Sequence, residues 1–470
     1  MNTSQSIRSS RKLRVAFLTP SLHIGGAERW ILSLARNFQN VQPAGVVVCS
    51  PHHHPDMLEE AARLMPVYVA RKYGDARETR RLLERCCITA DVLITWGVPR
   101  LAMVTRRLVG RNAIPSVAID GRVANPSYDQ SYSFSRTRTR TSSSMDDAGG
   151  SHFEDEKTRT KYEDEIHSRR IDNPPYIPVI DVSHSDGAWE QQTKMVRRAA
   201  SGADFHVAVS RCALSAFPEQ VRSRATVIYN GVEADRVAPR QFLPLPPFPA
   251  TRREGRAEGS REICTRNSRR VSPHPKPLPE GEGTKRTALF LGRFEEVKGF
   301  DRLFVAAKHL PANWKIVAHG HGSLQSQIAN RKSQIEIRPP LNHVGDALAS
   351  ADVLVMPSRH EGMPLTLIEA WLAGTPVVAT PFGFIQEATQ MHGRLCEVVS
   401  QNPSGKELAD GIVRAAGGRF VDHARQIAWN HYTAAAMAQR WEEYLYEVCS
   451  VFGFQCSEAG ASNRKPKTEN

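Results

Sequence analysis

The sequence has no uninterrupted apolar run of the roughly 20 residues that a membrane-spanning helix needs. Its start, MNTSQSIRSSRKLRVAF, has neither the apolar stretch nor the small-residue cleavage site of a secretion signal. We therefore expect a cytoplasmic protein and leave open a peripheral association with the inner face of the membrane.

Paired metal-binding cysteines are also missing. The eight cysteines are scattered, with one adjacent pair and no C-x-x-C spacing. This pattern argues against a zinc site and against a disulfide framework, so we expect reduced thiols, no metal and no bound cofactor.

Acidic residues are in the minority. The formal charge of +13 favours an anionic partner such as a phosphorylated ligand or an anionic membrane. No amphipathic helix with a clear cationic face is evident near the N-terminus, and no basic module with interleaved aromatics indicates specific nucleic-acid binding.

The N-terminal half alternates apolar, β-rich segments with helical periodicity. Such strands, apolar on both faces, are typical of a parallel sheet covered by helices on both sides. The expected strands are 14–20, 44–50, 91–97, 114–120, 176–184, 205–210 and 225–230. We assign 12–237 to a Rossmann-like domain on the acceptor side.

Two polar tracts interrupt this rhythm. Residues 123–172 are rich in Ser, Thr and balanced charge and cannot bury enough apolar surface to order, so we expect a disordered insertion. Residues 238–285 are dense in Pro, Gly and basic residues, which suits a linker or insertion. We expect a further disordered tail at 451–470.

A second alternating set follows the linker. Its expected strands are 287–294, 314–320, 334–339, 352–358 and 375–380. We assign 286–430 to a second doubly wound domain and 431–450 to a C-terminal helix that could pack on either domain. The predicted fold is therefore α/β, with two Rossmann-like domains facing a central cleft lined by the carboxyl ends of both sheets.

The first strand of the second domain runs into Gly292-Arg293-x4-Lys298-Gly299. Two cations at a strand end, beside glycines that allow close backbone approach, can clamp a diphosphate. The alternative is a pair of solvated surface cations. A later turn, Gly320-His321-Gly322, offers amides that can hold phosphate, although any strand-to-helix turn can use glycine.

Residues 361–374, EGMPLTLIEAWLAG, place two carboxylates around the start of an apolar helix. We expect Pro364 at the first helical position, where proline is favoured. Glu361 and Glu369 can accept hydrogen bonds from vicinal sugar hydroxyls. The alternatives are compensation of the helix dipole for Glu361 and an ion pair with a base such as Arg359 for Glu369.

The order of these elements resembles the donor domain of retaining glycosyltransferases of family 4, which have the two-domain GT-B fold. The resemblance covers about 287–395 and includes the E-x7-E pattern of Glu361 and Glu369. It extends more loosely to Gly25 and Gly26, which match the family's glycine loop, and to ATVIYNGVEADRVAP at the domain junction.

This resemblance implies a metal-independent, retaining transfer of sugar from a nucleotide-sugar donor to a glycan or lipid-linked acceptor, in cell-surface polysaccharide biosynthesis. The chain has no Asp-x-Asp triplet to bridge a diphosphate through a metal. Arg293 and Lys298 would neutralise the diphosphate instead.

By the same resemblance, Glu369 would hold the ribose and Glu361 the donor sugar, and His184 would orient the sugar or share a proton with the acceptor. An imidazole bonded within its own turn is the alternative for His184. The expected donor-binding residues are Gly25, Gly26, Gly292, Gly320, Gly322, Gly362, Met363, Pro364, Leu365 and Glu369.

Two other functions stay open. One is a nucleotide-sugar epimerase of the same fold, which the combination of Gly-Arg-x4-Lys-Gly with E-x7-E disfavours. The other is a non-catalytic protein that binds a nucleotide-sugar or an anionic surface. The two insertions favour it, and the intact Gly25, Gly26 and His184 disfavour it.

Overall fold

The computed structural model describes residues 12–98, 104–105, 177–187, 194, 196–197, 200, 202–237, 285–327 and 335–451. The expected strand 114–120 and insertion 123–172 lie outside these residues, as do the linker at 238–285 and the tail at 451–470 apart from residues 285 and 451. Unit 1 comprises residues 1–231, 360–363 and 434–470, and unit 2 comprises residues 232–359 and 364–433.

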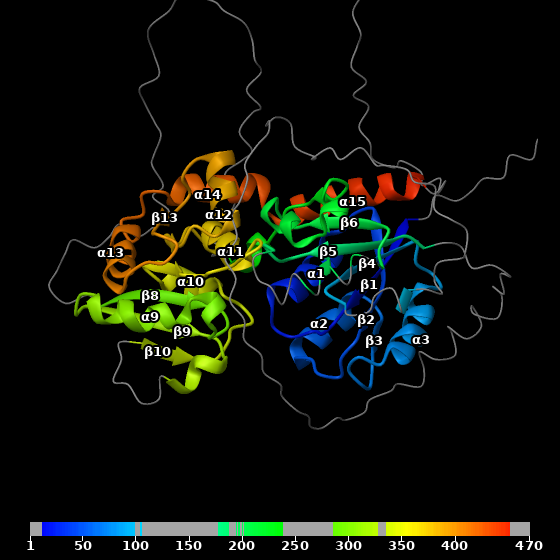
Figure 1. Ribbon diagram of the computed structural model, residues 1–470, viewed down its shortest axis with the longest axis horizontal. Helices are drawn as coiled ribbons and strands as arrows, with labels where there is room; N and C mark the ends of the chain where they lie inside the picture. Colours follow the sequence, from blue (N-terminus) through cyan, green and yellow to red (C-terminus); the bar gives the residue numbers. More distant parts are fainter. Residues whose placement is uncertain are drawn as a thin grey trace, which may run out of the picture. The chain divides into compact units, whose positions relative to one another are not determined.

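Unit 1 is built on a parallel sheet of seven described strands in the order β3-β2-β1-β4-β5-β6-β7 (Figure 1). The strands are β1 (Leu13–Thr19), β2 (Val41–Val48), β3 (Val67–Val69), β4 (Val92–Trp96), β5 (Val179–Ser183), β6 (Phe205–Ala208) and β7 (Thr226–Val227). The order runs outward from β1 in both directions, as in a doubly wound sheet. The α/β prediction is confirmed for this half.

Local signals explain where the helices of unit 1 begin. These helices are α1 (Gly26–Asn37), α2 (Pro55–Leu64), α3 (Ala76–Cys87), η1 (Cys212–Ala216), α7 (Glu219–Arg222) and α15 (Ala434–Val451). Pro55 opens α2, where a missing N–H costs nothing. The Asp75 carboxylate accepts from the backbone N–H groups of Arg77 and Glu78 and caps α3.

The C-terminal helix α15 packs on α1 in unit 1. The Trp441 ring meets the Trp30 ring edge-on at 5.5 Å. The buried Glu442 carboxylate accepts from the backbone N–H groups of Gln39 at 2.6 Å, Asn40 at 2.7 Å and Val41 at 3.1 Å. A segment far away in sequence thus completes the first domain.

Unit 2 contains a parallel sheet of six described strands in the order β10-β9-β8-β11-β12-β13. The strands are β8 (Arg286–Leu291), β9 (Trp314–His319), β10 (Ile335–Arg338), β11 (Val353–Met356), β12 (Val377–Ala379) and β13 (Glu397–Val398). The second predicted α/β domain is therefore present. Short β3 and β13 were not expected, because two or three residues give too little pattern to detect.

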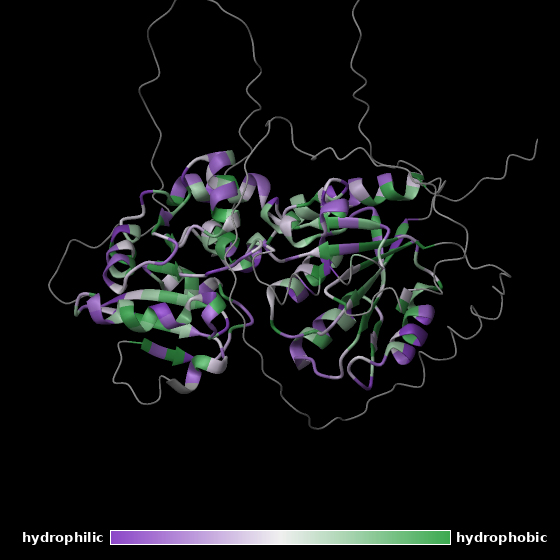
Figure 2. Cartoon of the chain, in the orientation of Figure 1, coloured by the Kyte–Doolittle hydropathy of each residue, from purple (hydrophilic) through white to green (hydrophobic). Residues whose placement is uncertain are grey.

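The helices of unit 2 cover this sheet. They are α8 (Ala234–Val237), η2 (Glu296–Lys298), α9 (Phe300–Ala306), η3 (Ala307–His309), η4 (Ser323–Gln327), α10 (Gly345–Ser350), α11 (Leu365–Ala373), α12 (Gly383–His392), α13 (Gly405–Ala415) and α14 (Val421–His431). One core cluster joins β8, β9 and β11 to α9 and α13 through side chains such as Phe300, Ile316 and Ile412. Figure 2 shows the strands of both sheets largely in hydrophobic colour. This apolar support fixes the strand ends from which the candidate site residues project.

None of the described helices has the length and apolar composition needed to cross a bilayer.

Candidate functional site

In unit 2 the turns after β8 and β9 pack directly on each other. Gly292 N–H donates to the His319 carbonyl at 3.1 Å, and Phe294 N–H donates to the His321 carbonyl at 2.8 Å. A Cβ on Gly320 would lie 1.9 Å from the Gly292 carbonyl oxygen, and the Gly320 φ of 156° is positive. Only glycine fits there, so the two predicted glycine turns come together at one edge of the sheet.

Gly322 belongs to the same packed edge. A Cβ there would lie 2.6 Å from the Phe294 carbonyl oxygen, which also accepts from Leu324 N–H at 3.0 Å. The backbone around Gly292, Gly320 and Gly322 is therefore closely packed, and a side chain at Gly320 or Gly322 would clash with it.

The two predicted cations follow β8 on this edge. Arg293 lies 2.8 Å from Glu295 in an ion pair, with its side chain 44% exposed. Lys298 ends the short helix η2. An exposed ion pair of this kind contributes little to stability and can exchange its partner for a stronger anion.

The end of β11 braces the turn that carries Lys298. Arg359 N–H donates to the Val297 carbonyl at 2.9 Å, and the Arg359 guanidinium makes two hydrogen bonds of 2.7 Å to Asp301. These bonds raise the pKa of Arg359. Arg302, the residue after Asp301, donates from Nη1 to the Pro357 carbonyl at 2.8 Å. Rigid support of this kind preorganises a binding turn.

Helix α11 carries the second acid of the E-x7-E pattern. Glu369 is buried, as are the adjacent residues Ile368 and Ala370 of the same helix. The position expected for Pro364 was wrong by one residue: Pro364 is the extended N-cap, and Leu365 is the first helical residue. Its ψ of 129° explains this, because the backbone there has not yet turned into the helix.

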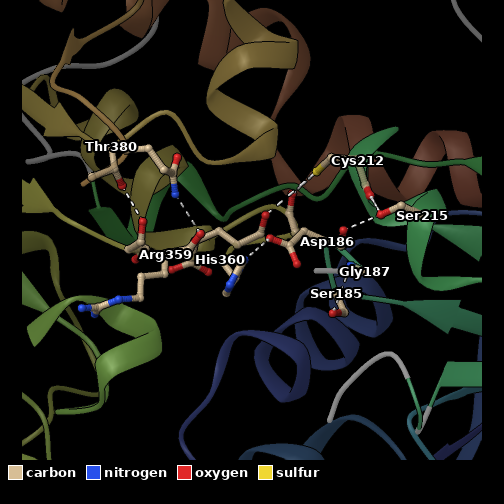
Figure 3. A network of polar contacts seen from close by, with 12 residues as sticks. Ser185, Asp186, Gly187, Cys212, Ser215, Arg359, His360 and Thr380 are labelled. Carbon is tan, nitrogen blue, oxygen red and sulfur yellow. Dashed lines mark hydrogen bonds and ion pairs between the residues drawn. The ribbon is translucent and has the colours of Figure 1, made fainter. Parts of the chain in front are cut away.

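Residues 360–363 leave unit 2 and pack as part of unit 1. The Ser210 hydroxyl donates to the Gly362 carbonyl at 2.9 Å, and the Cys212 thiol donates to the same oxygen at 3.1 Å. His360 Nδ1 lies 3.3 Å from an Asp186 carboxylate oxygen. Figure 3 shows the His360 ring directed at Asp186 within this network. The segment that bears Glu361 is therefore tied to the ends of β5 and β6.

Two further contacts fix the same segment. A Cβ on Gly362 would lie 2.2 Å from the His184 carbonyl oxygen, so only glycine allows this approach. The Asn230 amide donates to the Met363 carbonyl at 3.1 Å. The structure thereby brings the predicted residues Gly362 and Met363 beside the predicted His184.

His184 follows β5 in an aromatic environment. Its ring lies edge-on to Trp30, with centroids 5.1 Å apart, and to Trp96, with centroids 5.7 Å apart. Nε2 is buried and has no hydrogen-bond partner among the described residues. Burial lowers the pKa of His184 to about 3. The imidazole is therefore neutral near pH 7 and can accept or donate one hydrogen bond but carries no charge.

The predicted glycine loop opens α1 in unit 1. Gly25 is the N-cap and Gly26 the first helical residue. Buried Glu28 lies in the first turn, and the Ser21 hydroxyl donates to its carboxylate at 3.2 Å. Trp96 Nε1, at the end of β4, donates to Thr19 Oγ1 at 3.0 Å, and Thr19 is the last residue of β1 before this loop.

Several residues of unit 1 that surround His184 and hold residues 360–363 in place were not predicted from the sequence: Trp30, Trp96, Asp186, Ser210, Cys212 and Asn230. A weak signal existed for Ser210 and Asn230, since each lies just after an apolar segment where parallel strands present their carboxyl ends. Nothing in the sequence links Trp30, in a helix, to His184, more than a hundred residues later.

Among the described residues, no group of three or more His, Cys, Asp or Glu side chains is arranged to hold a metal ion. The cationic groups of the unit 2 edge, Arg293 and Lys298, are suited to a phosphate-bearing ligand.

Comparison with known proteins places this arrangement in a family context. Residues 285–417 match the family model described as Glycosyl transferases group 1. The predicted resemblance to this group of glycosyltransferases is confirmed over that segment, whereas membership of family 4 stays a prediction.

Curated relatives show the same kinship. The chain is 31% identical over 130 residues to TuaC of Bacillus subtilis, named as a glycosyltransferase of teichuronic acid biosynthesis, covering 28% of this chain and 33% of TuaC. It is 30% identical over 172 residues to a D-inositol 3-phosphate glycosyltransferase of Mycolicibacterium gilvum, covering 32% of this chain and 38% of that protein. The chain thus matches only about a third of each of these two relatives.

Solved structures extend the likeness to the fold. HepE of Anabaena, crystallised with UDP and glucose, aligns with a TM-score of 0.59 and 14% identity, over 93% of this chain and 100% of HepE. At this identity the match speaks only for the fold. It confirms the predicted GT-B class, with two Rossmann-like domains.

Proposed function

We propose that this protein is a retaining glycosyltransferase that moves a sugar from a nucleotide-sugar to a glycan or glycolipid acceptor in cell-surface polysaccharide biosynthesis. The observation that carries the proposal is the unit 2 edge, where Arg293 and Lys298 follow a turn packed on a second glycine turn, within the segment that matches group 1 glycosyltransferases. Both the family and the local chemistry favour a diphosphate ligand there.

In this proposal Arg293 and Lys298 neutralise the diphosphate and stabilise the charge that develops on the leaving group as the glycosidic bond breaks. Arg293 gives up its ion pair with Glu295 for the stronger phosphate contact. Asp301 and Arg359 act indirectly, because they hold the turn that carries Lys298. Because two cations neutralise the diphosphate, the transfer needs no metal in this proposal. We also propose that the transfer takes place in the cytoplasm.

In this proposal the two glutamates of the E-x7-E pattern bind the hydroxyl groups of the donor. Glu369 accepts from the ribose hydroxyls and Glu361 from the donor sugar, while the amides of Gly362 and Met363 contact sugar and phosphate. Gly25 and Gly26, at the start of α1, present amides to the donor or acceptor. We propose that Pro364 and Leu365 bind through their backbone at the start of α11.

His184 acts as a neutral imidazole in this proposal. Burial lowers its pKa to about 3, which excludes an imidazolium at physiological pH. Its buried Nε2 has no hydrogen-bond partner among the described residues, and in this proposal it bonds a sugar hydroxyl of the bound donor. His184 would therefore orient the sugar by hydrogen bonding.

The first test is donor binding followed by thermal shift, with a panel of nucleotide-sugars, with and without a chelator. UDP-sugars are the first to try, because HepE, which shares the fold, was crystallised with UDP-glucose. Lys298→Ala and Glu369→Gln should each abolish the stabilisation by the active donor. Lys308→Ala is the matched control, because Lys308 is an exposed lysine of the same unit in η3.

A donor-specific shift that persists in the chelator and is lost in both variants would support the proposal and identify the sugar. Absence of a shift with every donor would contradict it and favour a non-catalytic binding protein. A donor that both shifts the protein and is converted to its epimer would favour an epimerase instead.

A further inference from the structure

Helix α3 of unit 1 has one buried face and one strongly basic face. Thr79, Leu83, Cys86 and Cys87 are buried, and Leu83 and the two cysteines join a core cluster with β1, β2 and β4. Burial raises the pKa of Cys86 to about 12, which fits a structural role for this face. The buried face leaves the opposite side of the helix pointing outward.

The outward side is cationic. Arg77, Arg81 and Arg85 recur every four residues and are all exposed, so they form one stripe along the helix. Arg71 and Lys72 are exposed just before the helix. From residue 71 to residue 88 the exposed charges are thus five cations and a single acid, Glu84.

The other two acids of this segment are engaged with the backbone. Asp75 accepts from two N–H groups at the start of α3, which lowers its pKa. Glu78 accepts from Arg71 N–H at 3.0 Å. These two carboxylates accept hydrogen bonds from the backbone of the same segment, so the outward stripe is formed by the arginines.

Each end of the stripe carries an exposed apolar side chain. Tyr73 is 57% exposed and Ile88 is 42% exposed, and they are two of the four exposed large hydrophobic residues in the described part of the chain. A tyrosine and an isoleucine beside clustered cations match the interface of a bilayer, where aromatic and aliphatic groups enter the headgroup layer. Figure 2 shows α3 as one of the most hydrophilic helices of the molecule.

We propose that this surface docks on an anionic lipid membrane. The surface, called here the α3 face, consists of Arg71, Lys72, Tyr73, Arg77, Arg81, Arg85 and Ile88. Cations attract the anionic headgroups, and the two apolar side chains anchor the helix parallel to the membrane plane. A nucleic acid would also attract the arginines, but its phosphate backbone would make no favourable contact with an exposed isoleucine. The inference goes beyond the proposed function and does not depend on it.

The sequence of α3, ARETRRLLERCC, contains charges of both signs. The structure separates those charges, since it directs the arginines outward and occupies Asp75 and Glu78 with backbone amides.

The test is co-sedimentation of the full chain with phosphatidylcholine vesicles, with and without about a third of phosphatidylglycerol. We expect binding only to the anionic vesicles and loss of binding at high salt. Arg77→Glu/Arg81→Glu/Arg85→Glu should weaken binding by at least about 100-fold, and Tyr73→Ala/Ile88→Ala by about tenfold. Lys308→Glu/Lys406→Glu/Arg419→Glu is the control, because it changes the net charge by the same amount at exposed sites of unit 2.

Equal binding by the wild type and the α3 variant would overturn the proposal. Equal loss in the control variant would also overturn it, because net charge alone would then explain binding. Tighter binding to an oligonucleotide duplex than to vesicles, abolished by the α3 variant, would assign the surface to nucleic acid instead. Far-ultraviolet circular dichroism and the donor-induced thermal shift report whether each variant is folded, independently of the membrane result.

Discussion

The two units use the same kind of parallel sheet but differ in how they treat buried polar groups. In unit 2 the polar groups near the strand ends are bonded within the unit, as with Arg302, whose guanidinium reaches two carbonyls and the Asn402 side chain. In unit 1 several buried polar atoms have no partner among the described residues, including His184 Nε2, Thr95 Oγ1 and both carboxylate oxygens of Asp181.

This difference is informative because buried polar groups in native proteins are usually satisfied. Asp181 and Thr95 lie side by side on β5 and β4, and burial raises the pKa of Asp181 well above its ordinary value. A neutral Asp181 avoids the cost of a buried charge. The polar groups near the strand ends of unit 2 are thus already hydrogen-bonded. Unit 1, in contrast, has buried polar atoms without a partner among the described residues, both at the carboxyl ends of its strands and within them. Four variants test this difference between the two units.

The largest effect should come from the unit 2 cations. Lys298→Ala should lower kcat/KM for sugar transfer by about 100- to 1000-fold, because a preorganised charge opposite the leaving group is lost. Initial rates with the active donor would measure this. Lys308→Ala should stay within about twofold of the wild type, and a Lys298→Ala enzyme that is equally active would remove the diphosphate clamp from the proposal.

The next effect should come from the loop that unit 1 holds. Ser210→Ala/Cys212→Ala removes both donors to the Gly362 carbonyl and should reduce kcat by about 10- to 100-fold through misplacement of Glu361. Steady-state kinetics would measure it alongside thermal melting. Ser450→Ala is a suitable control, because that exposed serine donates to the Glu447 carbonyl of its own helix. A matching drop in stability without a change in kcat would show that the contacts are merely structural.

The attachment of α15 should matter for stability more than for chemistry. Glu442→Ala leaves three backbone N–H groups without their carboxylate and should reduce the free energy of unfolding by about 3 kcal/mol. Urea unfolding would measure the loss. Glu443→Ala is the matched control, because the neighbouring Glu443 is exposed and accepts from the Gln439 side chain of the same helix. Equal losses in both variants would contradict the role assigned to Glu442.

The smallest effect should be the pH dependence caused by His184. Its folded pKa of about 3 lies below the unfolded value of 6.5, so the unfolded state binds the proton first as the pH falls. Stability is therefore lost as the pH drops below about 6.5, by about 2 kcal/mol or less between pH 7 and pH 5. Urea unfolding at both pH values should show that His184→Phe removes this part of the loss.

The contribution of His392, whose pKa burial lowers to about 4, persists in both the wild type and His184→Phe. Only the difference between the two proteins therefore reports on His184. An identical pH dependence would show that the imidazole is less buried than the geometry implies.

The sequence alone predicted both α/β domains, because strands that are apolar on both faces leave a strong local pattern. It also singled out Arg293, Lys298 and the glycine turns, since residues that directly follow a parallel strand share one edge of the sheet. The position of Pro364 was wrong by one residue, because the last extended residue and the first helical residue differ only in backbone angle.

Only the tertiary structure decided which distant residues share the environment of His184 and of the Glu361 segment. Trp30, Ser210, Cys212 and Asn230 come from separate elements, and contacts between elements leave no periodic trace in a sequence. The structure likewise decided that α15 completes unit 1 and that the arginines of α3 point outward. Local propensity fixes a helix or a strand, but packing of the apolar faces decides which side of it is left for function.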